Sequence, residues 1–163
     1  MAIEPTVAID AKATSCTLLG RFENIDATIE AFGFENEEAE GDTLLVLHGL
    51  DPYKSYTKTF FVTTKEGGKV SKTVTFTTEV LSLKTLVPKV ISAGNVIVSA
   101  ETNIDDEEMN VGFEWRRTDW TDEFASKTGG AALYEGVMEG YIRSLYTEKL
   151  WKYRPYYISN SGV

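Results

Sequence analysis

The sequence predicts an all-β fold made of two antiparallel β-sandwiches in series. The chain carries an internal repeat, which is the first feature to seek in a new sequence. Its apolar residues alternate with polar ones, as in strands that bury one face, and turn signals separate these runs without a capped helical stripe between them. With 163 residues, the length permits one ordinary domain or two small ones, and the repeat selects two.

The repeat begins with a pair of short motifs. The segment Asn24–Asp26 is followed, after six intervening residues, by Gly33–Glu35. The same pair of motifs recurs as Asn103–Asp105 and Gly112–Glu114, again with six residues between them. The offset between the copies is 103 minus 24, or 79 residues. Two copies of one strand-built unit therefore account for the chain.

A second match lies near the end of each copy. Lys58–Val62 aligns with Arg154–Ile158, and the offset here is 154 minus 58, or 96 residues. The second copy therefore carries 96 minus 79, or 17, additional residues between its two anchors. We expect the first unit to span residues 1–84 and the second to span residues 85–163, with a 17-residue insertion.

Strands can be assigned along both units from this alternation and from runs of β-branched and aromatic residues. Gly-, Pro- and Asp-containing turns separate them. In the first unit the expected strands include Val7–Ala11, Cys16–Leu18, Lys58–Val62 and Val70–Thr78, with breakers at Leu50–Tyr53 and Glu66–Gly68. In the second unit they include Val96–Val98, Val111–Trp115 and Trp151–Tyr157, with turns at Thr128–Gly130 and Asn160–Gly162.

These residues resemble a known family. The first unit, with Leu50–Pro52, Tyr56, the alternating run Lys58–Val62, the turn Gly67–Gly68 and the strand ending Phe76–Thr78, is similar to the second half of a fibronectin type III domain. The second unit, with Trp151–Tyr157 before Asn160–Gly162, resembles fibronectin-like repeats of large Bacteroidetes surface proteins and of the phages that infect these bacteria. The resemblance implies Ig-like sandwiches of seven strands in two sheets, in tandem, without catalysis. It also implies that Tyr56 bonds through its hydroxyl to upstream backbone, as a tyrosine corner.

The second unit departs from this pattern at its end. In the first unit, ten residues from Lys69 to Thr78 supply the final strand, whereas only Val163 follows Gly162 in the second. We therefore expect the second sandwich to lack its final strand and to expose an edge that can pair with another chain. Two explanations stay open: the chain is the front part of a longer array, or a following domain or another chain donates the strand. Pro155 predicts a bulge or an edge in this strand.

Charge and composition exclude several functions. The 25 acidic and 16 basic residues give a net charge of −9, which argues against binding to nucleic acid or to anionic membranes. The longest apolar run, Leu44–Leu47, is far too short for a spanning helix, so we expect no membrane insertion. The single cysteine, Cys16, excludes an internal disulfide. The N-terminus lacks a secretory signal, so either the protein is not exported by that route or the signal has been removed from the sequence.

The sequence carries no motif for catalysis, a cofactor or a metal. His48 is the only histidine, and neither it nor Cys16 belongs to a nucleophile motif. The acidic clusters at residues 35–42 and 105–108 leave calcium binding open, although they lack the spacing of an EF-hand loop. Carboxylates around the insertion, such as Asp119 and Glu135, could form a glycosidase pair, but a small sandwich seldom supplies the required cleft. We expect the protein not to be an enzyme.

Aromatic residues are concentrated in the second unit, which holds all three tryptophans. Trp115 continues an inward strand face and is expected in the core, while Trp151 is expected to pack under the turn before its strand. Trp120, Phe124 and Tyr134 are the predicted contact residues for a ligand or partner, because exposed rings stack on sugars or anchor proteins.

The leading hypothesis is a non-catalytic spacer that acts as an adhesion or binding segment outside the cell or at its surface. Its partner would be a protein or polysaccharide on a surface. One alternative is a virion component that decorates a capsid or tail. The other is a carbohydrate-binding module that uses the exposed aromatics of the second unit, Trp120 and Phe124 above all.

Overall fold

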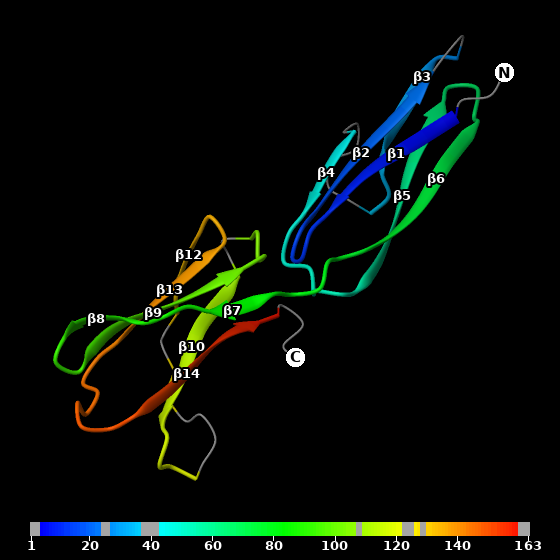
Figure 1. The fold of residues 1–163 in the computed structure, drawn as a ribbon. Helices are drawn as coiled ribbons and strands as arrows, with labels where there is room; N and C mark the ends of the chain where they lie inside the picture. The colour runs from blue at the N-terminus through cyan, green and yellow to red at the C-terminus, as the bar shows by residue number, and fades with distance from the viewer. Residues whose placement is uncertain are drawn as a thin grey trace. The chain divides into compact units, whose positions relative to one another are not determined.

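The computed structural model describes residues 4–23, 27–36, 43–106, 109–121, 126–127 and 130–159. Every regular element in these ranges is a β-strand, and none of the described segments is a helix long and apolar enough to cross a membrane (Figure 1). The chain divides into two compact units, Met1–Glu79 and Val80–Val163. This division differs from the expected boundary after Lys84, because the strand Leu83–Thr85 pairs within the second unit.

The first unit is a sandwich of two three-stranded antiparallel sheets. One sheet has the order β1-β2-β4 and the other the order β3-β5-β6. This is the A-B-E and C-F-G arrangement of Ig-like sandwiches, which confirms the expected fold class. The strands are β1 (Glu4–Ala11), β2 (Cys16–Glu23), β3 (Ile29–Phe34), β4 (Leu44–Leu47), β5 (Ser55–Thr64) and β6 (Lys69–Thr77).

The predicted tyrosine corner is present in the first unit. The Tyr56 hydroxyl accepts a hydrogen bond from the backbone N–H of Asp51, five residues upstream, at 2.8 Å. The ring of Tyr56 stacks on Phe76 from β6, with the ring centroids 5.8 Å apart. The hydrogen bond therefore fixes the chain just before β5, and the ring contact with Phe76 covers the core at the same place.

The second unit is a sandwich with a larger and a smaller sheet. The larger sheet has the order β12-β13-β9-β7, with β8 also paired to β9, and the smaller has the order β11-β10-β14. The strands are β7 (Leu83–Thr85), β8 (Lys89–Ser92), β9 (Asn95–Thr102), β10 (Asn110–Arg117), β11 (Ser126–Lys127), β12 (Ala132–Tyr134), β13 (Val137–Ile142) and β14 (Trp151–Ile158).

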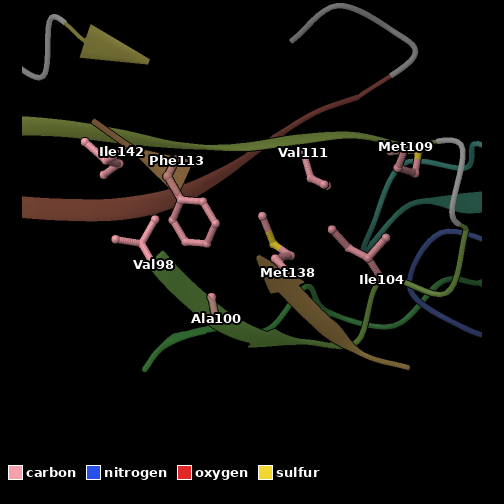
Figure 2. Close-up of a cluster of buried hydrophobic side chains, with 8 residues drawn as sticks. All are labelled: Val98, Ala100, Ile104, Met109, Val111, Phe113, Met138 and Ile142. Carbon is pink, nitrogen blue, oxygen red and sulfur yellow. The ribbon is translucent and has the colours of Figure 1, made fainter. Parts of the chain in front are cut away.

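The core of the second unit lies between these two sheets. Phe113 and Val111 of β10 face side chains of β9 and β13 in the opposite sheet (Figure 2). Strand alternation explains this, since every second residue points inward. The buried cluster consists of Val98, Ala100, Ile104, Met109, Val111, Phe113, Met138 and Ile142, and Trp115 packs at its border.

The two units differ in the pairing of their last long strands within the described residues. In the first unit β5 lies between β3 and β6, whereas β14 pairs only with β10 in the described part of the second unit. Pro155 lies opposite Phe113 in a ladder whose register is regular along its whole length. The edge alternative for Pro155 is therefore correct, and the bulge is not needed.

The hydrogen-bonded registers correct the second repeat match by one residue. Gly33 lies opposite Phe61, and its repeat equivalent Gly112 lies opposite Tyr156. The offset of these strands is thus 156 minus 61, or 95, and the insertion has 95 minus 79, or 16, residues. The sequence match had aligned aromatic residues by type, but a slip of one residue exchanges the two faces of a strand.

The corrected register places Trp151 at the position of Tyr56. The indole N–H of Trp151 donates to the carbonyl oxygen of Tyr146, five residues upstream, at 3.2 Å. A tryptophan therefore forms the corner of the second unit, with the opposite direction of donation. The expectation that Trp151 packs under the turn before β14 is consistent with this bond.

Candidate functional site

The candidate site is an aromatic corner of the second unit, where the end of β10 meets the start of β14. Register pairs Arg117 with Trp151, so the residues after Arg117 lie beside the beginning of β14. Trp120 stands there with 39% of its surface exposed, and its ring meets Trp151 edge to face with the centroids 5.9 Å apart. Such a contact fixes an aromatic ring while it leaves part of the ring accessible.

Two arginines hold Trp120 in this position. The guanidinium of Arg117 lies 5.6 Å from the centroid of the Trp120 ring, within the range of a cation–π contact. Arg116 donates from a terminal guanidinium nitrogen to the carbonyl oxygen of Trp120 at 3.1 Å. The N–H of Trp120 in turn donates to the carbonyl oxygen of Arg117 at 3.3 Å, which closes the turn. The exposed ring is thus fixed through both its backbone and its π face.

Asp119 completes the charged part of the corner. It accepts two hydrogen bonds from Arg117, one of them at 2.9 Å, and Lys149 lies 3.9 Å from the same carboxylate. The hydrogen bond from Arg117 is the main reason why the pKa of Asp119 lies below its usual value. Asp119 is therefore ionised at neutral pH and does not suit the role of a general acid.

A shallow pocket borders the corner on the side of the connection between β13 and β14. It has a volume of about 320 Å³ and is lined by Arg117 and by the segment Tyr146–Lys149. The ring of Tyr146 is largely exposed. The corner therefore combines accessible aromatic surface with neighbouring positive and negative groups, which is the chemistry of a binding surface.

The three predicted contact residues do not form one surface. Tyr134, which is 67% exposed, pairs with Val137, and Val137 pairs with Glu101 at the end of β9. The corner lies at the other end of that sheet, since its apolar neighbourhood includes Val96. Trp120 and Tyr134 therefore lie at opposite ends of the unit, and Phe124 lies outside the described residues.

The structure adds residues that sequence reasoning left out of the site. Arg117, Tyr146 and Trp151 surround Trp120, and their proximity follows from strand pairing between positions far apart in the chain. The only sequence signal was the concentration of aromatic residues in the second unit.

The residues weighed for catalysis give no catalytic constellation in the described part of the chain. Cys16 is fully buried, and burial, with a smaller contribution from Asp10, raises the pKa of its thiol to about 11. Asp119 and Glu135 lie at opposite ends of the second unit, because Glu135 directly follows Tyr134. No group of three or more His, Cys, Asp or Glu side chains in the described ranges is placed to hold a metal ion. Residues 37–42 and 107–108 of the acidic clusters lie outside those ranges.

Comparison with known proteins gives fold-level similarity only. No protein-family model and no curated protein matches the sequence. The solved FN1–FN3 domains of chicken CNTN1 align at 13% identity and a TM-score of 0.34, over 96% of this chain and 62% of that chain. The chitinase ChiA74 from Bacillus thuringiensis aligns at 13% identity and a TM-score of 0.33, over 94% of this chain and 26% of that chain.

A third solved structure concerns carbohydrate-binding modules of the β-sandwich superfamily. It aligns at 10% identity and a TM-score of 0.34, over 94% of this chain and 95% of that chain. The chain spans less than two thirds of the CNTN1 and chitinase chains. Because all three TM-scores are low, the assignment of Ig-like sandwiches rests on the strand order and on the tyrosine corner.

Proposed function

We propose that this protein is a non-catalytic binding module whose aromatic corner contacts a protein or polysaccharide at a surface. The observation that supports this most directly is the fixed, partly exposed ring of Trp120 on Trp151. A ring held in place loses little conformational entropy when it binds, so it can anchor a partner. The first unit then acts as a spacer, and the role belongs outside the cell or at the cell surface.

Binding through a sugar face is the more specific form of this proposal. Apolar faces of pyranose rings stack on exposed aromatic side chains, and the nearby Arg117, Asp119 and Lys149 can hydrogen-bond to hydroxyl groups. A protein partner could use the same corner through an aromatic or arginine side chain. The proposal also includes a strand donor among the partners, because β14 is an edge strand in the described residues.

A glycan array tests the sugar form, with immobilised surface proteins as a second arm. The Trp120→Ala variant is expected to bind at least about tenfold more weakly than the unchanged protein. Tyr134→Ala is the matched control, since Tyr134 is a more exposed aromatic residue at the other end of the same unit. Equal losses in both variants, or no binding in either arm, would contradict the role of the corner. Cell fractionation tests the location, and recovery with purified virions would instead select the virion alternative.

A further inference from the structure

The backbone of β14 directs hydrogen-bonding groups toward its open side. On the neighbouring strand, the carbonyl oxygen of Val111 accepts a bond from the N–H of Ala131 at 2.8 Å, so the backbone of Val111 points away from β14. Phe113, two residues on, has the same orientation in an antiparallel ladder. Its partner Pro155 therefore directs its backbone to the open side of β14. The N–H that proline lacks is thus missing at the edge and not within the ladder.

The same orientation holds at Tyr153 and Trp151, which precede Pro155 by two and four residues. From Trp151 to Pro155 the edge therefore presents N–H groups at Trp151 and Tyr153 and carbonyl oxygens at all three positions. In the first unit, the carbonyl oxygen of Thr59 accepts a hydrogen bond from the N–H of Glu35 at 2.9 Å, so the backbone of Thr59 points toward β3. The backbone N–H and carbonyl groups of the even-numbered residues of β5 therefore point toward β6. The open edge of β14 thus repeats the edge that β5 offers to β6.

An apolar pocket of about 160 Å³ lies beside this edge. An apolar cavity of about 150 Å³ can hold a benzene ring, so the pocket has room for one aromatic side chain. Its walls come from both sheets of the second unit. They include the rings of Trp115, Trp151 and Tyr153 together with Pro88, Val96 and Ile142.

The first unit shows which side chain belongs in such a place. Phe76 of β6 lies opposite Tyr56, is 6% exposed, and shares the buried cluster that includes Cys16. Trp151 is the equivalent of Tyr56 in the corrected register. Val96 is the equivalent of Cys16, because Val96 pairs with Ile142, the last residue of β13, and Cys16 pairs with Leu47, the last residue of β4. Phe76 therefore fills in the first unit the position that the pocket occupies in the second.

Two exposed apolar residues lie next to residues that line the pocket. Val87, which is 90% exposed, directly precedes Pro88, and Val90, which is 71% exposed, pairs with Val96. In the first unit β6 lies beside β1, the first strand of that sandwich. A strand laid along β14 would likewise lie beside the first strands of the second unit and cover this apolar surface.

We propose that β14 accepts an extended strand that neither the described residues nor a second copy of this chain supplies, antiparallel to it, with an aromatic side chain opposite Trp151 that fills the pocket. This inference rests on the proposed strand donor and specifies its register and chemistry. Backbone donors and acceptors spaced along one edge suit a peptide strand and not a sugar. On the outer face, the residue of the incoming strand that lies opposite Lys152 corresponds to Thr75 of β6. A carboxylate is favoured at this position because it would pair with the lysine.

A nine-residue peptide with the sequence of Lys69–Thr77 is the probe, added to the full chain. Amide NMR should show shifts and slowed hydrogen exchange at Trp151 and Tyr153. A peptide with Phe76→Ala should bind at least about tenfold more weakly, because the ring is the main apolar anchor. A peptide with Thr75→Glu should bind roughly twofold more tightly at low salt, through Lys152.

Backbone methylation of the peptide provides the matched control without any risk to protein folding. The N–H of Val74 would face β14, whereas the N–H of Thr75 would point away from it. Methylation at Val74 should abolish binding, and methylation at Thr75 should preserve it. Equal effects of the two methyl groups would contradict strand pairing.

The remaining outcomes separate this inference from the function of the corner. No change at Trp151 and Tyr153 with millimolar peptide would refute strand acceptance, while loss of ligand binding in Trp120→Ala would still support the corner. Peptide binding that Phe76→Ala leaves unchanged would refute the pocket as the anchor. If the protein dimerises without peptide and its β14 amides are then protected from exchange, a second copy occupies the edge. If free indole binds in the pocket without protecting these amides, the pocket is a small-molecule site. Either result overturns the proposal.

Discussion

Gly20 offers the sharpest test of how the core of the first unit is packed. A Cβ added at Gly20 would lie 2.4 Å from two ring carbons of Phe60. Ordinary carbon contacts are about 3.5 to 4.0 Å, so the ring or the strand would have to move by more than about 1 Å. Phe60 is fully buried, and its ring packs 5.1 Å from Phe34 and 6.4 Å from Phe22. The ring therefore cannot turn aside without displacing its neighbours.

The expected cost of Gly20→Ala follows from these contacts. Overpacking a core costs about 1 to 3 kcal/mol, and replacement of glycine by alanine returns about 0.4 to 1 kcal/mol by restricting the unfolded chain. The net effect is a loss of about 1 kcal/mol in the free energy of unfolding of the first unit. With a urea slope of about 1 kcal/mol per molar for a small domain, the unfolding midpoint should fall by about 1 M.

The two units can be followed separately in one urea titration. All three tryptophans lie in the second unit, so tryptophan fluorescence reports that unit alone, while circular dichroism reports both. Gly20→Ala should shift the transition that circular dichroism shows and fluorescence does not, and it should leave the fluorescence transition unchanged. Combination with Phe60→Leu should recover more than about 1 kcal/mol relative to additivity, because the smaller side chain makes room for the new methyl group. An unchanged transition of the first unit, or additive losses in the double variant, would refute the proposed clash.

Three further predictions concern single groups. Tyr56→Phe leaves the N–H of Asp51 without its acceptor and should destabilise the first unit by about 1 to 2 kcal/mol, measured by urea unfolding; no measurable loss would mean that the corner bond is not stabilising. The Cys16 thiol should resist a thiol reagent at pH 8 until the unit unfolds, because burial raises its pKa to about 11. The pKa of the Cys16 thiol in the folded state exceeds its ordinary value of 9.0, so the contribution of the thiol to stability is complete below pH 9 and is lost as the pH rises toward 11. Between pH 9 and pH 11, Cys16→Ala should therefore lose less stability in urea unfolding than the unchanged protein. Tyr153→Phe removes the hydrogen bond to the carbonyl oxygen of Leu86 and should lower the stability of the second unit by about 1 kcal/mol, seen as an earlier tryptophan fluorescence transition; an unchanged transition would contradict it.

The sequence predicted most of the architecture because alternation and turn chemistry are local signals. Several strands of each unit, the corner at Tyr56 and the edge at Pro155 follow from residue types at short spacing. The faces of β14 could not be assigned in the same way. The match between Lys58–Val62 and Arg154–Ile158 joined residues of similar type that point to opposite sides of their strands.

The site was predicted only in part, because its contacts depend on pairing between distant positions. Trp120 reaches Trp151 because Arg117 pairs with Trp151, which lies 151 minus 117, or 34, positions further along the chain. Tyr134 is close to Trp120 in sequence, but β12 places it at the other end of the larger sheet. A composition argument can therefore find an aromatic-rich unit, but strand register decides which rings meet.

The two units also differ in one strand, since β5 has a neighbour on both sides whereas β14 has a neighbour on one side in the described residues. In the first unit, threonine hydroxyls pair across β5 and β6, between Thr57 and Thr75 at 3.0 Å and between Thr59 and Thr73 at 2.9 Å, so these positions on the outer face of that hairpin are uncharged. At the equivalent position of β14 stands Lys152, which is exposed. Exposed lysine and an edge proline both discourage indiscriminate pairing of edge strands. If the proposed strand acceptance is correct, the same two residues narrow the choice of partner, because Pro155 removes one donor and Lys152 favours an acidic neighbour. Specificity at such an edge would then depend on the missing N–H of Pro155 as well as on the charge of Lys152.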